Sequence, residues 1–328
     1  MQQTELPAPI TRAARDVFAG VDLGTPMTGY DRPWATAQIK TPAVKSDYVW
    51  ALDKIKTMIA FFYSGGTALK LIGQTGTGKT EFVTQFHAAL NLPLFFIGAN
   101  PKMEAYHLLG REVPSPSGNE WRDGPMLIAA RYGLSILIDE YNVLDAGEST
   151  GLNAFLEGRP YTIPDTGETV VPAQGFRVFV TVNPKSFGYS GRNTQDLAND
   201  DRFIDLVFEY PEPEVEAAMV VDMLKNSMRQ PDDMAKNIAS TVVSCANKIR
   251  ESFMGVSDSD DALPFTMSRR GVMEWARWVV LSKSLVTAKH SPLHHAADLV
   301  LGNRQDREGR LALHQIIELH TGQKEVTA

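Results

Sequence analysis

The stretch GQTGTGKT at Gly73–Thr80 decides the fold, because it fits the phosphate-binding pattern GxxxxGK[ST]. The apolar run Ala68–Ile72 before it is suited to a buried strand, and the pattern from Glu81 to Leu90 after it is helical. A strand, a glycine loop and a helix in this order are the context that the pattern requires. The backbone N–H groups of the loop and the helix N-terminus then favour an anion at one place.

We expect this loop to hold the phosphates of a nucleotide together with Mg²⁺. Lys79 can reach the β- and γ-phosphates, and the Thr80 hydroxyl can hold the metal ion. The expected cofactors are therefore ATP and Mg²⁺. The predicted nucleotide-binding residues are Gly73, Gln74, Thr75, Gly76, Thr77, Gly78, Lys79, Thr80 and Glu81.

The composition is that of a globular protein with one large or two ordinary domains. The chain has 328 residues, of which 43% are hydrophobic and 22% are charged. Its net charge of −7 provides no global basic field for nucleic acid. Cys245 is the one cysteine, so no internal disulfide is expected and the composition suits a reducing cytoplasm. We find no signal-peptide layout and no apolar run long enough to span a membrane, so both are expected to be absent.

The sequence predicts an N-terminal arm over 1–45, an α/β core over 46–212 and a helical domain over 213–328. Apolar strands alternate with helical segments in the core, which indicates a five-stranded parallel sheet, and the chain beyond Pro213 has helical periodicity only. The strand candidates are Ala68–Ile72, Leu94–Ile97, Leu134–Glu140, Phe176–Val182 and Leu206–Tyr210.

Other elements are predicted from local patterns. We expect a short helix over Ile10–Phe18, a helix from Ser46 to Tyr63 with Ser46 as its N-cap, and a helix over Gly147–Leu156. Two hairpins are predicted at 110–121 and 159–171, because extended pieces flank a Pro/Ser/Gly turn and a Pro-Asp-Thr-Gly turn.

Three polar residues follow apolar strands and are candidate catalytic residues. Asp139 and Glu140 end one strand, and Asn183 ends the next. The carboxyl ends of parallel strands meet at one edge of the sheet, so these residues are expected near the glycine loop. We expect Asp139 to hold Mg²⁺ through water, Glu140 to polarise the attacking water, and Asn183 to bond the γ-phosphate or the water.

Arginines are expected to neutralise charge on the γ-phosphate, in cis or from a neighbouring chain. Arg202 is the first candidate, with a surface ion pair to Asp200 or Asp201 as the alternative, and Arg192 is the second. Arg270 follows Arg269 at the start of a helix in the helical domain and could reach back to the nucleotide. Two solvated arginines are the alternative there.

Together these motifs resemble those of the AAA+ ATPases. GQTGTGKT looks like Walker A and Leu134–Glu140 like Walker B, while Asn183 matches sensor 1, Arg202 an arginine finger and Arg270 sensor 2. The hairpins resemble the helix-2 insert and the pre-sensor-1 hairpin of the MoxR and chelatase branch. Within that branch the sequence resembles most the small ATPase subunit of aerobic cobaltochelatase (CobS-like). It departs from the family at Arg269, where a proline is usual, and at Gln74-Thr75.

The resemblance implies a ring, normally a hexamer, that hydrolyses ATP between subunits and remodels a client complex. It also implies a partner with a von Willebrand factor A (VWA) domain and a helical lid domain. Three alternatives stay open: a nucleic-acid motor on the same core, a nucleotide-binding scaffold without turnover, and a CobS-like protein of a mobile element without a chelatase role. The acidic balance and the absence of a Lys/Arg run disfavour the nucleic-acid motor.

Overall fold

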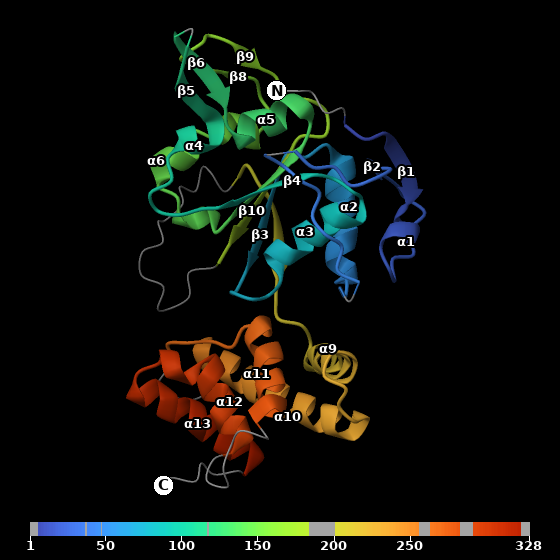
Figure 1. Cartoon of the computed structure of the whole chain (residues 1–328), viewed down its shortest axis with the longest axis vertical. Helices are drawn as coiled ribbons and strands as arrows, with labels where there is room; N and C mark the ends of the chain where they lie inside the picture. Colours follow the sequence, from blue (N-terminus) through green and yellow to red (C-terminus); the bar gives the residue numbers. More distant parts are fainter. Residues whose placement is uncertain are drawn as a thin grey trace. The chain divides into compact units, whose positions relative to one another are not determined.

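The computed structural model describes residues 6–36, 38–46, 48–116, 118–183, 201–255, 263–282 and 291–322 (Figure 1). These residues form two compact units. The first holds the described chain up to Gly73 and from Gly78 to Phe208, and the second holds the described chain from Glu209 onward. Gln74–Thr77, in the middle of the glycine loop, belong to the second unit, which the sequence did not predict.

The first unit is built on the predicted parallel sheet of five strands. Its spatial order is β11-β3-β10-β7-β4, and every neighbouring pair is parallel. The carboxyl ends of β3, β10 and β7 therefore lie side by side at the edge where the predicted site residues follow their strands. The strands are β3 (Ala68–Gly73), β4 (Leu94–Gly98), β7 (Ser135–Asp139), β10 (Arg177–Val182) and β11 (Ile204–Phe208).

Helices bury both faces of this sheet, which explains its continuous apolar strands. On one face, α2 (Leu52–Ser64) and α3 (Lys79–Ala89) pack against Leu71 and Phe179. On the other face, α5 (Pro125–Tyr132) shares a core with Val178 and Val180 of β10, because side chains of successive strand residues point to opposite faces. Figure 1 shows α2 and α3 next to each other on their face.

The N-terminal arm differs from the prediction. The expected helix over Ile10–Phe18 is wrong in its first half, because β1 (Pro9–Ala13) pairs antiparallel with β2 (Pro26–Tyr30) and only α1 (Ala14–Val17) is helical. Phe18 is fully buried and its ring lies 5.1 Å from that of Phe86. The arm therefore contributes to the core on the α2–α3 face.

Two predicted helix boundaries are also wrong. Helix α2 begins at Leu52 and not at Ser46, because the extended segment before it places the Trp50 ring edge-on against Phe18 and Phe82, at 5.1 and 6.2 Å. The helix expected over Gly147–Leu156 is divided, with Leu152 fully buried at the break. Its parts are α6 (Ala146–Thr150) and α7 (Asn153–Leu156), and the short η1 (Tyr141–Val143) precedes them.

Both predicted hairpins are confirmed. The first consists of β5 (Gly110–Ser115) and β6 (Gly118–Asp123) and follows α4 (Ala105–Leu109). The second consists of β8 (Tyr161–Thr162) and β9 (Thr169–Val170). Figure 1 shows both on the same side of the first unit, next to α5.

The second unit is helical, as predicted, and has its own core. Trp275, Val242 and Cys245 are fully buried in it, and burial raises the pKa of the Cys245 thiol to about 11. Within the described part of the chain, no helix has the length and apolar character needed to cross a membrane. The elements are α9 (Pro213–Asn226), α10 (Asp232–Phe253), α11 (Arg269–Ser282), α12 (Pro292–Val300), η2 (Gly302–Arg304) and α13 (Arg307–Thr321).

His87 on α3 is expected to make the stability depend on pH. It is fully buried, its Nδ1 lies 2.8 Å from the Val83 carbonyl oxygen, and burial lowers its pKa to about 4. In the unfolded chain the imidazole of this histidine has a pKa of about 6.5, so the unfolded state binds a proton at a higher pH than the folded state does. The free energy of unfolding therefore falls as the pH drops from about 6.5 toward 4. We expect this residue to lower the free energy of unfolding by up to about 3 kcal/mol over this pH range.

The measurement is urea unfolding of the wild type and the His87→Phe variant between about pH 7 and pH 5. The variant is expected to lose stability less steeply, whereas His107→Ala, a change at an exposed histidine, should keep the wild-type slope. Equal slopes for the wild type and His87→Phe would contradict the assignment.

Candidate active site

The glycine loop adopts a conformation that only glycine takes readily. Gly76 and Gly78 have φ of +80° and +96°, in the left-handed region. Helix α3 begins directly after Gly78, and no side chain caps its first turn. The N–H groups of that turn therefore lack intrahelical partners and sit at the positive end of the helix dipole, which favours an anion.

Lys79 connects the loop to the end of β10. Its side chain is buried, and its Nζ donates hydrogen bonds to the Gly73 carbonyl oxygen at 2.7 Å and to Asn183 Oδ1 at 2.9 Å. The Asn183 carbonyl oxygen in turn accepts from Asn142 Nδ2 at 3.2 Å. The structure thus brings together Lys79 and Asn183, which the sequence placed at one edge, and adds Asn142, which the sequence analysis missed.

Two hydroxyl groups converge on one oxygen of Asp139. Thr80 Oγ1 donates to Asp139 Oδ1 at 2.7 Å, and Thr181 Oγ1 donates to the same atom at 2.5 Å. A hydroxyl oxygen beside a carboxylate is the kind of donor set that Mg²⁺ accepts in proteins. Thr80 and Asp139, predicted separately as magnesium residues, are therefore in contact and fit the ion.

Glu140 leaves the direction of its strand immediately after Asp139. It has φ of +58° and ψ of +39°, and its backbone N–H donates to Thr181 Oγ1 at 3.0 Å. A left-handed conformation at a residue other than glycine costs about 1–3 kcal/mol, which this hydrogen bond helps to offset. The turn frees Glu140 from the alternation of strand side chains, and its side chain is exposed.

Thr181 is the functional candidate that sequence reasoning missed. It lies on β10 next to the residue that pairs with Ile138 of β7, so it falls beside the end of β7. Its hydroxyl gives a hydrogen to Asp139 and accepts one from Glu140. A buried threonine in an apolar strand looks like core, and only the register between β10 and β7 could have indicated its role.

Two other predicted residues are engaged in ion pairs. Glu81 pairs with Lys45 at 2.8 Å and accepts a hydrogen bond from Gln85. Arg202 Nε lies 2.6 Å from Glu157 Oε1, an ion pair that the sequence did not predict. Arg192 and Asp200 lie outside the described residues.

Arg270 belongs to the second unit, which also contains Gln74–Thr77 of the glycine loop. Within that unit, Arg270, Thr75 and Ser268 line a cavity of about 550 Å³. The Tyr210 hydroxyl donates to the Thr75 carbonyl oxygen at 3.0 Å. A Cβ atom on Gly76 would lie 2.3 Å from that of Ser268, so glycine is required there. Arg269 is the first residue of α11.

The arrangement can perform nucleotide chemistry. The N–H groups of the loop and Lys79 can bind a polyphosphate, Thr80 and Asp139 can hold a divalent cation, and the neighbouring Glu140 can accept a proton from water. The described residues contain no group of three or more His, Cys, Asp or Glu side chains that could hold a metal ion without a nucleotide.

Comparisons with known proteins agree with this geometry. Residues 68–203 match the family model described as "AAA domain (dynein-related subfamily)". The chain is 33% identical over 162 residues to Protein CbbQ of Hydrogenophilus thermoluteolus, covering 48% of this chain and 59% of CbbQ. It is 31% identical over 175 residues to Denitrification regulatory protein NirQ of Stutzerimonas stutzeri, covering 49% and 62%. Over 241 residues it is 27% identical to Protein NorQ of Paracoccus denitrificans, covering 71% and 83%.

The match covers residues 68–203, the part of the chain that contains the parallel sheet except for β11, and the observed sheet between helices confirms the predicted α/β fold. This range includes Lys79, Asp139, Glu140 and Asn183. The chain spans about three fifths of the length of CbbQ and NirQ. The finer resemblance to the cobaltochelatase subunit stays a prediction.

Proposed function

We propose that this chain is a Mg²⁺-dependent ATPase that assembles into a ring, normally a hexamer, and uses ATP hydrolysis to remodel a partner complex. The observation that carries the proposal is the convergence of Thr80, Thr181 and the Glu140 backbone around Asp139, at the edge where the glycine loop leaves β3. This arrangement places a cation site, a phosphate cradle and a candidate base together. The test is phosphate release by the purified protein with ATP and Mg²⁺.

The residues divide the chemistry among them. Lys79 and the loop N–H groups bind the β- and γ-phosphates, and Asn183 hydrogen-bonds the γ-phosphate or the attacking water. Mg²⁺ held by Thr80 and Asp139 supplies neutralisation of the phosphate charge. Glu140 orients the water and accepts its proton as the water oxygen bonds to the γ-phosphorus and the bond to the β–γ bridging oxygen breaks.

The ring would complete the site between subunits. We infer that Arg202 of a neighbouring chain stabilises charge on the transferring phosphoryl group and that Arg270 acts from the helical domain. Arg202 would have to exchange its ion pair with Glu157 for the phosphate. A heterologous interface that supplies an arginine in trans closes naturally into a ring.

The client is proposed to be a protein complex in the cytoplasm, reached with a partner that carries a VWA domain. NirQ is named as a denitrification regulatory protein, which supports a regulatory role for this chain. A metal chelatase is one such client, and a CobS-like protein of a mobile element is the alternative. Stimulation of phosphate release by DNA would instead favour the nucleic-acid motor, which the net charge of −7 disfavours.

Lys79→Ala is expected to weaken ATP binding by at least about tenfold, because it removes the cation that faces the β- and γ-phosphates. Titration with a fluorescent ATP analogue measures the dissociation constant. Lys45→Ala removes a cation of the same kind that pairs with Glu81, and it should keep the wild-type constant. An unchanged constant in Lys79→Ala would exclude the proposed role.

Glu140→Gln is expected to bind ATP and to lower the rate of phosphate release by about 10²-fold or more, because the amide cannot accept the proton from water. Single-turnover and steady-state assays separate binding from turnover. Asp165→Asn, in the exposed turn of the second hairpin, is the matched control and should turn over normally. Wild-type turnover in Glu140→Gln would show that the base lies elsewhere.

Thr181→Val keeps the shape of the side chain but removes the hydroxyl that holds Asp139 and Glu140. We expect kcat to fall by about tenfold with little change in ATP affinity, because one hydrogen bond in a catalytic arrangement is worth about 1–2 kcal/mol. Thr181→Ser retains the hydroxyl and should restore kcat. If Val and Ser variants behave alike, Thr181 has no positioning role.

A further inference from the structure

Two arginines face each other at the base of the first hairpin. The register of β5 and β6 pairs Arg111 with Arg122, and both side chains are exposed. Residues directly opposite in an antiparallel pair have Cβ atoms only about 4.5–5.5 Å apart, and like charges there are destabilising. The hairpin therefore places two like charges side by side, an arrangement that does not serve its own pairing.

The carboxylates of the same hairpin are committed to other partners. Each accepts a hydrogen bond from a neighbouring side chain. The bonds are Asn119 Nδ2 to Glu112 Oε2 at 3.0 Å, Ser115 Oγ to Glu120 Oε1 at 2.7 Å, and Trp121 Nε1 to Asp123 Oδ1 at 2.8 Å. Among the residues that the structure describes, no ion pair is recorded for Arg111 or Arg122. An incoming anion could thus bind either guanidinium group without breaking an ion pair to one of these carboxylates.

The two arginines border a hollow with an aromatic wall. Its volume is about 210 Å³. Tyr106 and His107 line it together with Arg111 and Arg122, and so does Asp123, whose carboxylate is paired with Arg131 at 2.6 Å. The rings of Tyr106 and His107 stack with centroids 4.0 Å apart, and Tyr106 is 39% exposed. Guanidinium groups recognise carboxylates through paired N–H donors, and an aromatic face can pack on the CH₂ groups of a glutamate stem.

The base of this hairpin is held firmly. Gly110 has φ of +132°, and a Cβ atom there would lie 2.5 Å from the Arg122 carbonyl oxygen. The Gly124 N–H donates to the Leu109 carbonyl oxygen at 2.8 Å. These close approaches fix β5 and β6 against the end of α4, so the two guanidinium groups start from a defined backbone.

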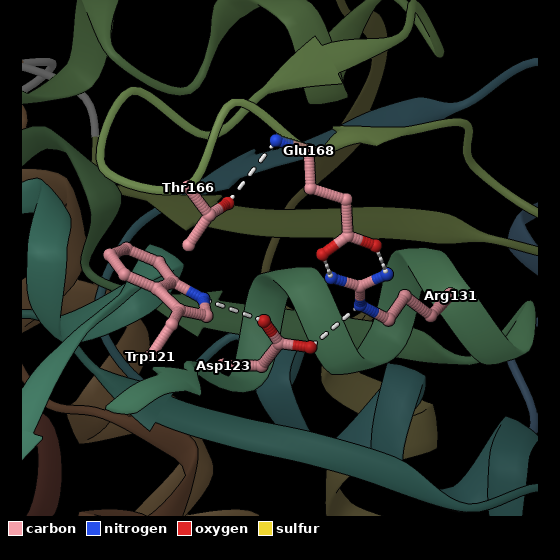
Figure 2. Close-up of polar contacts among 5 residues, drawn as sticks. All are labelled: Trp121, Asp123, Arg131, Thr166 and Glu168. Atoms are coloured by element: carbon pink, nitrogen blue, oxygen red, sulfur yellow. Dashed lines mark hydrogen bonds and ion pairs between the residues drawn. The ribbon is translucent and has the colours of Figure 1, made fainter. Parts of the chain in front are cut away.

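Arg131 fastens the first hairpin to the second, as Figure 2 shows. From α5, its Nε donates to Asp123 Oδ2 at 2.6 Å, and its Nη atoms reach both carboxylate oxygens of Glu168, one of them at 2.8 Å. The Glu168 N–H also donates to Thr166 Oγ1 at 3.2 Å. This ion pair lowers the pKa of Glu168, and the two hairpins form one supported surface.

We propose that Arg111 and Arg122 form a docking site for an acidic segment of a partner protein, with one glutamate or aspartate carboxylate on each guanidinium. This inference rests on the proposed remodelling function and names the chemistry of the client at the hairpins. A protein segment is favoured over nucleic acid because two guanidinium groups can each pair with one carboxylate, whereas a phosphate backbone is bound by a longer run of cations, which this hairpin lacks.

The test is fluorescence anisotropy of a labelled peptide of about ten glutamates with the full chain, with and without ATP and Mg²⁺. We expect saturable binding that weakens with salt and a loss of at least about tenfold in the Arg111→Ala/Arg122→Ala double variant. The Arg15→Ala/Arg277→Ala variant makes the same change in net charge at exposed arginines elsewhere and should bind as the wild type does.

Several outcomes would overturn the proposal: no binding by the wild type, equal binding by the Arg111/Arg122 variant, or equal loss in the Arg15/Arg277 variant. Tighter binding of single-stranded DNA of the same length, lost in the Arg111/Arg122 variant, would assign the site to nucleic acid instead. Phosphate release is measured in the same samples and should be unchanged in the double variant. Peptide binding without any phosphate release would therefore reject the ATPase proposal alone.

Discussion

One oxygen atom, Oδ1 of Asp139, is the point on which the candidate active site depends. It accepts hydroxyl hydrogens from Thr80 at the start of α3 and from Thr181 near the end of β10. Three elements from distant parts of the sequence are thus joined through a single carboxylate. This is possible only because the parallel order β3-β10-β7 brings the ends of these strands to one edge. The sheet topology is therefore the constraint, and the site chemistry follows from it.

The parts of the fold that depend on local patterns could be predicted from the sequence. Continuous apolar strands, a glycine loop before a helix and turn residues between extended pieces led to the sheet, the phosphate cradle and both hairpins. The parts that depend on distant contacts could not. Helix α2 starts after Trp50 because that ring packs on Phe18 and Phe82, and this tertiary contact outweighs an N-cap at Ser46. Strand β1 likewise needs β2, which lies beyond α1.

The same limit applies within the site. Lys79, Asp139 and Asn183 could be assigned from their motifs, since each follows or precedes a recognisable strand. Thr181 could not, because its hydroxyl acquires meaning only from the register that sets it beside β7. The partner of Arg202 is Glu157, which lies far away in the sequence and is also paired with Arg159. Each of two cations that share one carboxylate is held less strongly than it would be in a separate pair, which would suit the proposed exchange of partners by Arg202.

The sheet edge that carries Asp139 is connected to the two hairpins, β5–β6 and β8–β9, by two successive elements of the chain. Helix α5 carries Arg131, which holds both hairpins, and the chain runs from α5 directly into β7, which ends at Asp139. Helix α5 is packed in the same core as β7, and close-packed protein interiors transmit strain. Strand β7 and helix α5 are therefore the two elements that lie between Asp139 and the hairpins along this path. Two guanidinium groups at the surface that carries Arg111 and Arg122, and a rigid support beneath it, are what the proposed remodelling of an acidic client would require.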